Sequence, residues 1–119
     1  MNEIVIDKKE ELVMKLLHYF ITERGYNPVI IRGVKDEIWL ENLEDDYKIV
    51  RIVSGYIHNN EQFKFDIAKT KSLLKTIKKK TLSFKINALS IFVNLGDNVD
   101  ISEFEDTPNI KFANIHEAD

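Results

Sequence analysis

The 119-residue sequence predicts an α/β fold of the α+β type, formed as one domain over residues 1–119. Three observations predict it. Two long segments carry apolar residues at helical spacing, shorter segments between and after them are rich in β-branched residues, and the connections are too short to separate domains. The expected order is α-β-β-β-α-β-β, with an antiparallel three-stranded meander packed against two helices.

Residues 7–24 are expected to form the first helix. Asp7 precedes an acid by three residues, which is a variant of the capping box at a helix start. Gly25 follows the last turn, where a residue of left-handed conformation commonly ends a helix. The apolar stripe of this helix consists of Leu12, Val13, Leu16, Leu17, Phe20 and Ile21.

The remaining elements follow from β-branched runs and from a second helical repeat. Pro28 begins the first strand, a position at which a strand tolerates proline. The second helix carries a continuous seam of apolar residues and threonines in steps of three and four. The expected ranges are 28–34, 37–43, 47–53, 88–95 and 109–115 for the strands and 60–82 for the second helix.

The second and third strands are expected to form a hairpin in which the numbers of paired residues sum to 90. One face of this hairpin would be wholly apolar. On the other face Trp39 lies directly opposite Arg51, close enough for the indole to stack on the guanidinium. Glu37 and Glu41 lie diagonally from Arg51 and can accept its remaining hydrogen bonds.

Two interpretations of the polar hairpin face are open. In the first, the contact between the strands only stabilises the hairpin. In the second, the face is a docking surface, because tryptophan and arginine are enriched where interfaces concentrate their binding energy. The candidate binding residues are Trp39, Arg51, Glu37 and Glu41.

Charge is unevenly distributed along the chain, although the net charge is only −3. The segment from Lys64 to Lys85 holds eight lysines against the single acid Asp66, and acidic segments flank it. An anionic lipid surface suits such a helix, whereas the scarcity of arginine and of exposed aromatic residues argues against nucleic acid. The default interpretation is a solvated charged face, to which lipid and nucleic acid are the alternatives, and part of the charge suits a helix C-terminus. The candidate basic surface consists of Lys64, Lys71, Lys75, Lys78, Lys79 and Lys80.

No catalytic site, cofactor or metal is predicted. The chain has no cysteine and no G-x-S-x-G motif, and its glycines form no loop that would cradle a phosphate. His58 and Asp66 are weak candidates for metal ligands, with Glu61 as a weaker third. A catalytic transition-metal site usually needs three protein ligands and a structural site four.

The order of elements is similar to that of the restriction-endonuclease-like core. Asp46, Tyr47 and Lys48 imitate the D-x-K signature of that core, and Asp36 is a possible upstream acid. In an antiparallel hairpin, however, Asp36 and Asp46 begin opposite strands and lie roughly 25 Å apart. Two carboxylates that share a metal lie only a few ångströms apart, so this topology is expected without its active site.

Three short motifs resemble the N-terminal extramembrane domain of Firmicute-type rhomboid intramembrane serine proteases. They are Gly25-Tyr26 after the first helix, Glu37-Ile38-Trp39-Leu40-Glu41, and Ile49-Val50-Arg51-Ile52. The similarity is firm over about residues 12–53 and general over 54–119.

This resemblance implies a regulatory or recruiting domain on the cytoplasmic face of the cell membrane. Its partner would be the membrane-embedded protease core of the same polypeptide, with an anionic lipid surface or another protein as a further partner. No catalytic residue carries over, since the Ser–His dyad of that class lies in membrane helices. The sequence itself carries no pattern typical of a membrane span or a signal peptide, so a soluble, cytoplasmic domain is expected. A freestanding domain that binds protein or nucleic acid is the alternative.

Overall fold

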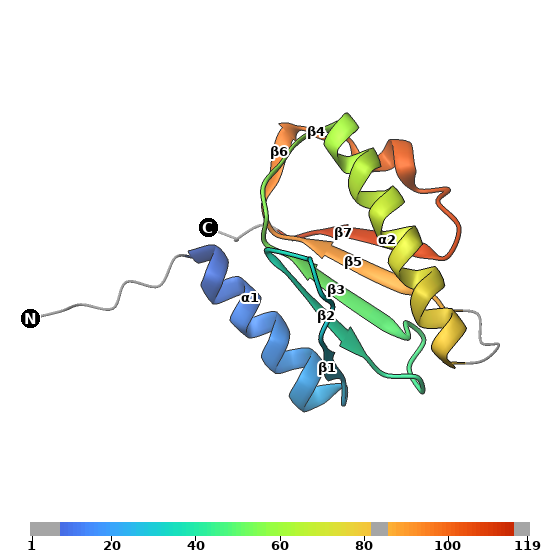
Figure 1. Cartoon of the computed structure of the whole chain (residues 1–119). Coiled ribbons are helices and arrows are strands. Elements are labelled where there is room, and N and C mark those ends of the chain that lie inside the picture. The colour runs from blue at the N-terminus through green and yellow to red at the C-terminus, as the bar shows by residue number, and fades with distance from the viewer. Residues whose placement is uncertain (1–7, 82–85, 116–119) are drawn as a thin grey trace, which may run out of the picture.

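The computed structural model describes residues 8–81 and 86–115, and the side chains of 8–77 and 86–115 (Figure 1). Its helices are α1 (Lys8–His18), a π-helical turn (Tyr19–Glu23), α2 (Asn60–Thr81) and a 3-10 turn (Ile101–Phe104). Its strands are β1 (Asn27–Val29), β2 (Glu37–Glu41), β3 (Ile49–Val53), β4 (Ile57–Asn59), β5 (Ala88–Phe92), β6 (Leu95–Asn98) and β7 (Ile110–Asn114). Within the described residues, no helix is both long enough and apolar enough to cross a bilayer.

Five strands form one mixed sheet in the order β1-β2-β3-β5-β7. β1, β2 and β3 are the expected antiparallel meander, whereas β5 lies parallel to β3 and β7 lies parallel to β5. The chain reaches β5 from β3 through α2, because a parallel neighbour requires a crossover. The α/β class is confirmed, and the two helices with the five strands of this sheet follow the expected order α-β-β-β-α-β-β.

The two helices cover opposite faces of the sheet (Figure 1). Successive side chains of a strand point to opposite faces of the sheet, so neighbouring residues of β2 pack in different hydrophobic clusters. Leu40 packs with Phe20 and with partly buried side chains of α1, whereas Trp39 packs with Leu74 of α2. A further cluster contains Phe63 of α2 and Phe92 at the C-terminal end of β5.

The hairpin register is confirmed. Trp39 pairs with Arg51 and Leu40 pairs with Val50, and every pair in β2 and β3 sums to 90. The apolar face of the hairpin lies under α1, as its alternation requires. The other face is not open, because α2 lies across it (Figure 1).

The first helix ends as its glycine predicts. α1 passes into the π-helical turn, and Gly25 then adopts φ +73, a left-handed conformation that favours glycine. Tyr26 is buried and donates its hydroxyl to the backbone oxygen of Tyr47 at 2.6 Å, which ties this end of the helix to the hairpin connection. Asp7, the expected capping residue, lies outside the described residues.

Several strand boundaries differ from the expected ones. β1 is only three residues long, and Ile30 beyond it is 93% exposed. The strand expected over 88–95 divides into β5 and the start of β6, which pairs with β4 in a separate two-stranded sheet. β4 and β6 are too short to show the alternation by which a strand is identified from sequence.

Candidate functional site

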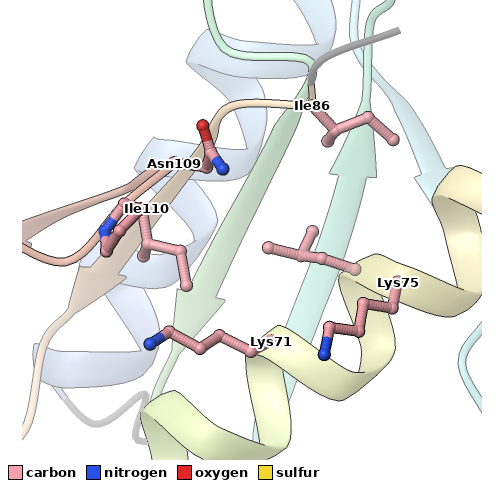
Figure 2. A pocket seen from close by; sticks show the side chains of 7 residues that line it. Lys71, Lys75, Ile86, Asn109 and Ile110 are labelled. Atoms are coloured by element: carbon pink, nitrogen blue, oxygen red, sulfur yellow. The ribbon is translucent and has the colours of Figure 1, made fainter. Parts of the chain in front are cut away.

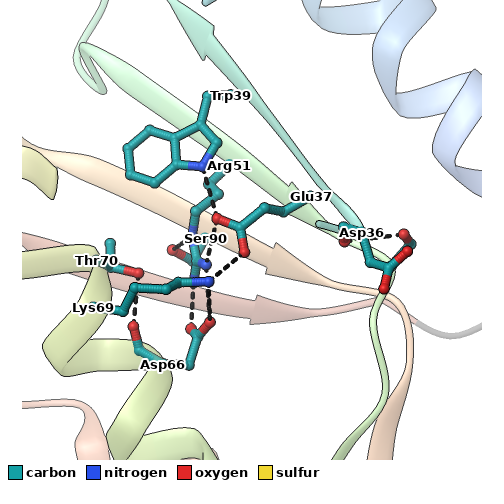
Figure 3. Close-up of polar contacts among 9 residues, drawn as sticks. Asp36, Glu37, Trp39, Arg51, Asp66, Lys69, Thr70 and Ser90 are labelled. Atoms are coloured by element: carbon teal, nitrogen blue, oxygen red, sulfur yellow. Dashed lines mark hydrogen bonds and ion pairs between the residues drawn. The ribbon is translucent and has the colours of Figure 1, made fainter. Parts of the chain in front are cut away.

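Four charged side chains meet between the sheet and α2, and we call them the Arg51 cluster: Glu37, Arg51, Asp66 and Lys69 (Figure 3). Two are acidic and two are basic, so the cluster is electrically neutral when all four are ionised. The side chains of Glu37, Arg51 and Asp66 are buried, whereas Lys69 is 35% exposed and lies between the cluster and solvent.

Arg51 connects four elements of the fold. Its Nη1 donates to Asp66 Oδ1 at 3.0 Å and to Glu37 Oε1 at 3.3 Å, and its Nη2 donates to Asp66 Oδ2. Its Nε donates to Ser90 Oγ at 3.2 Å. One guanidinium on β3 therefore holds β2, β5 and α2 together, with a two-pronged contact to Asp66 that suits its planar fork.

Trp39 makes the contact with Arg51 that its register predicts. The Arg51 Cζ atom lies 5.9 Å from the centre of the Trp39 ring and 5.6 Å from that of Phe92, both within cation–π range. The indole nitrogen donates to Glu37 Oε1 at 2.7 Å, so Glu37 accepts from both Trp39 and Arg51.

The second interpretation of this face, a docking surface, is wrong. Trp39 and Arg51 are each 1% exposed, because the Asp66 side of α2 lies over them. Glu41 accepts none of the hydrogen bonds of Arg51, which go to Glu37, Asp66 and Ser90 instead. These residues consequently form a buried polar contact and not an exposed docking surface.

Sequence reasoning missed three partners of this cluster: Asp66, Lys69 and Ser90. From sequence, Asp66 is predicted only as a weak candidate for a metal ligand. One signal was present: Asp66 lies between Phe63 and Thr70 on the seam that faces the sheet, and Thr70 donates its hydroxyl to the Asp66 backbone oxygen at 2.8 Å. An acid on an inward seam requires a buried cation, and Arg51 is on the facing strand.

The charges around Glu37 outweigh its burial. Burial by itself would raise the pKa of Glu37. The hydrogen bond from Lys69 Nζ to Glu37 Oε2, 2.6 Å long, together with the charge of Arg51 and the hydrogen bond from Trp39, holds that pKa below its ordinary value of 4.5. Glu37 is therefore a carboxylate at neutral pH, with its acceptor oxygens occupied by Lys69, Arg51 and Trp39.

The weak metal candidates are not brought together. His58 packs its ring on Tyr56 at 4.4 Å, Glu61 is exposed on the first turn of α2, and Asp66 is engaged by Arg51. No three metal-binding side chains gather within residues 8–81 and 86–115.

Asp36 and Asp46 lie at opposite ends of the hairpin, as expected. Asp36 directly precedes β2, and its backbone oxygen accepts from Ser54 and Gly55, just beyond the end of β3. Asp46 lies in the connection between β2 and β3. The two carboxylates therefore cannot share a metal ion.

A second feature lies on the outer side of α2, and we call it the lysine face: Lys64, Phe65, Lys71 and Lys75. All four side chains are exposed, Phe65 by 76%. None of the three lysines forms an ion pair with a residue that the structure describes. The side chains of Lys78, Lys79 and Lys80, and all of Lys85, lie outside the described part. Exposed aromatic side chains were expected to be scarce beside the lysines, and one is present, because Phe65 directly follows Lys64.

Comparison with known proteins gives a distant structural similarity. No protein-family model matches the sequence, and no similar curated protein is found. A structure described as the crystal structure of a repair endonuclease from Pyrococcus abyssi is similar, with a TM-score of 0.49 and 11% sequence identity. The similarity covers 98% of this chain and 50% of that one, so this chain spans about half its length. At this distance, no residue of that protein assigns a role to a residue here.

We expect Glu37→Gln to lower stability at neutral pH by about 1.5 to 3 kcal/mol, the range for hydrogen bonds to charged groups. The folded-state pKa of Glu37 is lowered, so its contribution is complete above 4.5 and is lost as the pH falls through the folded value. The difference between wild type and variant should therefore shrink in acid. Urea unfolding from pH 7 to pH 3 measures it.

Glu41→Gln is the matched control for this measurement, because it removes the same charge from the same strand outside the Arg51 cluster. A Glu37→Gln variant with the stability of wild type at every pH would show that Glu37 is not an ionised member of the cluster.

Proposed function

We propose that this chain is a non-catalytic regulatory domain that acts at the cytoplasmic face of a membrane, as the N-terminal extramembrane domain of a rhomboid-type intramembrane serine protease. The observation that carries the proposal is the lysine face of α2. Three exposed lysines without acidic partners in the described structure lie on one side of a 22-residue helix together with an exposed phenylalanine.

The lysine face has the chemistry of a peripheral membrane contact. The cytoplasmic leaflet carries a negative surface potential, and each lysine close to it contributes about 1 kcal/mol. An aromatic side chain beside such cations gains further free energy by entering the boundary between headgroups and acyl chains. Phe65 follows Lys64 directly, so one contact can engage both kinds of side chain.

The residues that resemble the rhomboid domain are those that build this fold. Gly25 ends the first helix with positive φ, Tyr26 ties that end to the hairpin, and Trp39 and Arg51 form the buried contact under α2. A domain that shares these residues would require them for the same packing. This supports a common fold, and a protease core in the same polypeptide is then the first partner to test.

The lysine face should bind anionic vesicles. Substituting Lys64, Lys71 and Lys75 together by glutamine should weaken binding to phosphatidylglycerol vesicles roughly 100-fold at low salt, at about 1 kcal/mol per lysine. Phe65→Ala should weaken it at low and at high salt, because its contribution is apolar. Vesicle flotation over a range of salt concentrations measures both effects.

The control is a triple variant with the same net charge, Lys15→Gln with Lys35→Gln and Lys111→Gln, whose exposed lysines lie on other elements. Equal losses in the two triple variants would mean that binding follows net charge alone and would contradict a contact through α2.

The native gene tests the rhomboid part of the proposal separately. We expect the reading frame to continue beyond the codon for Asp119 into several hydrophobic spans of about 20 residues each. Sequencing the gene on that side gives the answer, and a stop codon directly after Asp119 would contradict the proposal.

A freestanding nucleic-acid-binding domain is the second candidate, and Phe65 favours it. Single-stranded nucleic acid binds where aromatic side chains accompany a line of cations, because bases stack on the ring while lysines contact phosphates. An electrophoretic shift with single-stranded RNA and DNA, scanned over salt with the same variants, separates the two candidates. Binding of the lysine face to nucleic acid and not to vesicles would favour the second.

A further inference from the structure

A cavity of about 300 Å³ lies where the middle of α2 faces the start of β7 (Figure 2). Lys71 and Lys75 border it from α2, and Asn109 and Ile110 border it from the opposite side. Its volume is at the lower end of the range for small-molecule sites, which favours a compact ligand.

The floor of the cavity is apolar and belongs to the core. Leu74, Ile86 and Ile110 line it, and each is less than a tenth exposed. All three pack in the cluster that also contains Trp39. The floor is therefore held by the sheet and α2, and an apolar group placed on it would be removed from water without a rearrangement of the core.

The border of the cavity is cationic. Lys71 and Lys75 are four residues apart on α2, and such like-charged neighbours repel each other along a helix. Neither forms an ion pair with any residue that the structure describes. An anion placed between them would replace this repulsion with two attractions.

Asn109 adds a neutral donor at the opposite side. It has φ +66, and its backbone oxygen accepts from Ala88 at 2.8 Å, which fixes the residue at the start of β7. Within the described residues its carboxamide makes no hydrogen bond, so its amide hydrogens are available to a ligand oxygen.

We infer that this cavity binds a small anionic amphiphile, with one carboxylate or phosphate monoester head and a short apolar tail. The head lies between the ammonium groups of Lys71 and Lys75, within reach of the Asn109 amide. The tail covers Leu74, Ile86 and Ile110. The inference does not depend on the membrane contact proposed above, because the ligand is a single molecule inside a cavity and not a charged surface.

Methyl resonances of Leu74, Ile86 and Ile110 report the occupant directly. Full-length protein labelled at Ile and Leu methyls is titrated with octanoate and with octyl phosphate below their micelle concentrations. Octanol and inorganic phosphate serve as probes of the tail alone and of the head alone. We expect saturable shifts of these methyls with the two amphiphiles and none with octanol or inorganic phosphate at the same concentrations.

The double variant Lys71→Gln with Lys75→Gln should bind octanoate about tenfold more weakly or worse, because it loses both charge-assisted contacts to the head. Both side chains are exposed, so the variant should keep the thermal stability of wild type. Lys15→Gln with Lys35→Gln is the control with the same net charge, and it should bind like wild type because both exposed lysines lie away from α2.

Three outcomes would overturn the inference. The first is the absence of saturable methyl shifts with octanoate and octyl phosphate at millimolar concentration. The second is equal binding of octanol, or equal weakening in the control variant, because the two lysines would then not select the ligand. The third is a response only to vesicles that contain phosphatidic acid, which would assign these lysines to the surface contact and leave the cavity without a ligand of its own.

Discussion

A single buried guanidinium constrains this domain more than any other group. Arg51 lies in the middle of β3 with almost no exposure, and a buried cation must find acceptors within the protein. Asp66, Glu37 and Ser90 supply them from three other elements. Loss of any acid would leave charge without compensation in the core, so α2 must cross the sheet where Asp66 meets Arg51.

The contact between Asp66 and Arg51 determines which side chains of α2 point outward. Asp66 and Thr70 face the sheet, so the opposite side of the helix necessarily carries Lys64, Lys71 and Lys75 outward. Lys69 lies between these two sides, is partly exposed, and balances the second negative charge of the cluster by pairing with Glu37. One side of α2 thus faces a neutral interior in which the charged groups are paired. The other side carries exposed lysines without acidic partners among the described residues. Two of them, Lys71 and Lys75, border an apolar cavity.

The sequence predicts the class, the order of the main elements and the hairpin register, because alternation and a short connection leave few other pairings. It does not predict that the polar face of the hairpin is buried. A hairpin face that carries Glu37 on β2 and Arg51 on β3 normally faces solvent, and only the position of Asp66 on a distant helix shows that this face is covered. Phe65 was missed for the opposite reason, because aromatic residues in a helix are normally buried.

The central claim, that Arg51 holds α2 to the sheet through Asp66, is tested most directly by a double-mutant cycle. Urea unfolding is measured for wild type, Arg51→Met, Asp66→Leu and the double variant. Each single change should cost about 3 to 5 kcal/mol because it leaves the partner charge buried and unpaired. The double variant should lose clearly less than the sum of the two. Losses that add within about 0.5 kcal/mol would contradict the account.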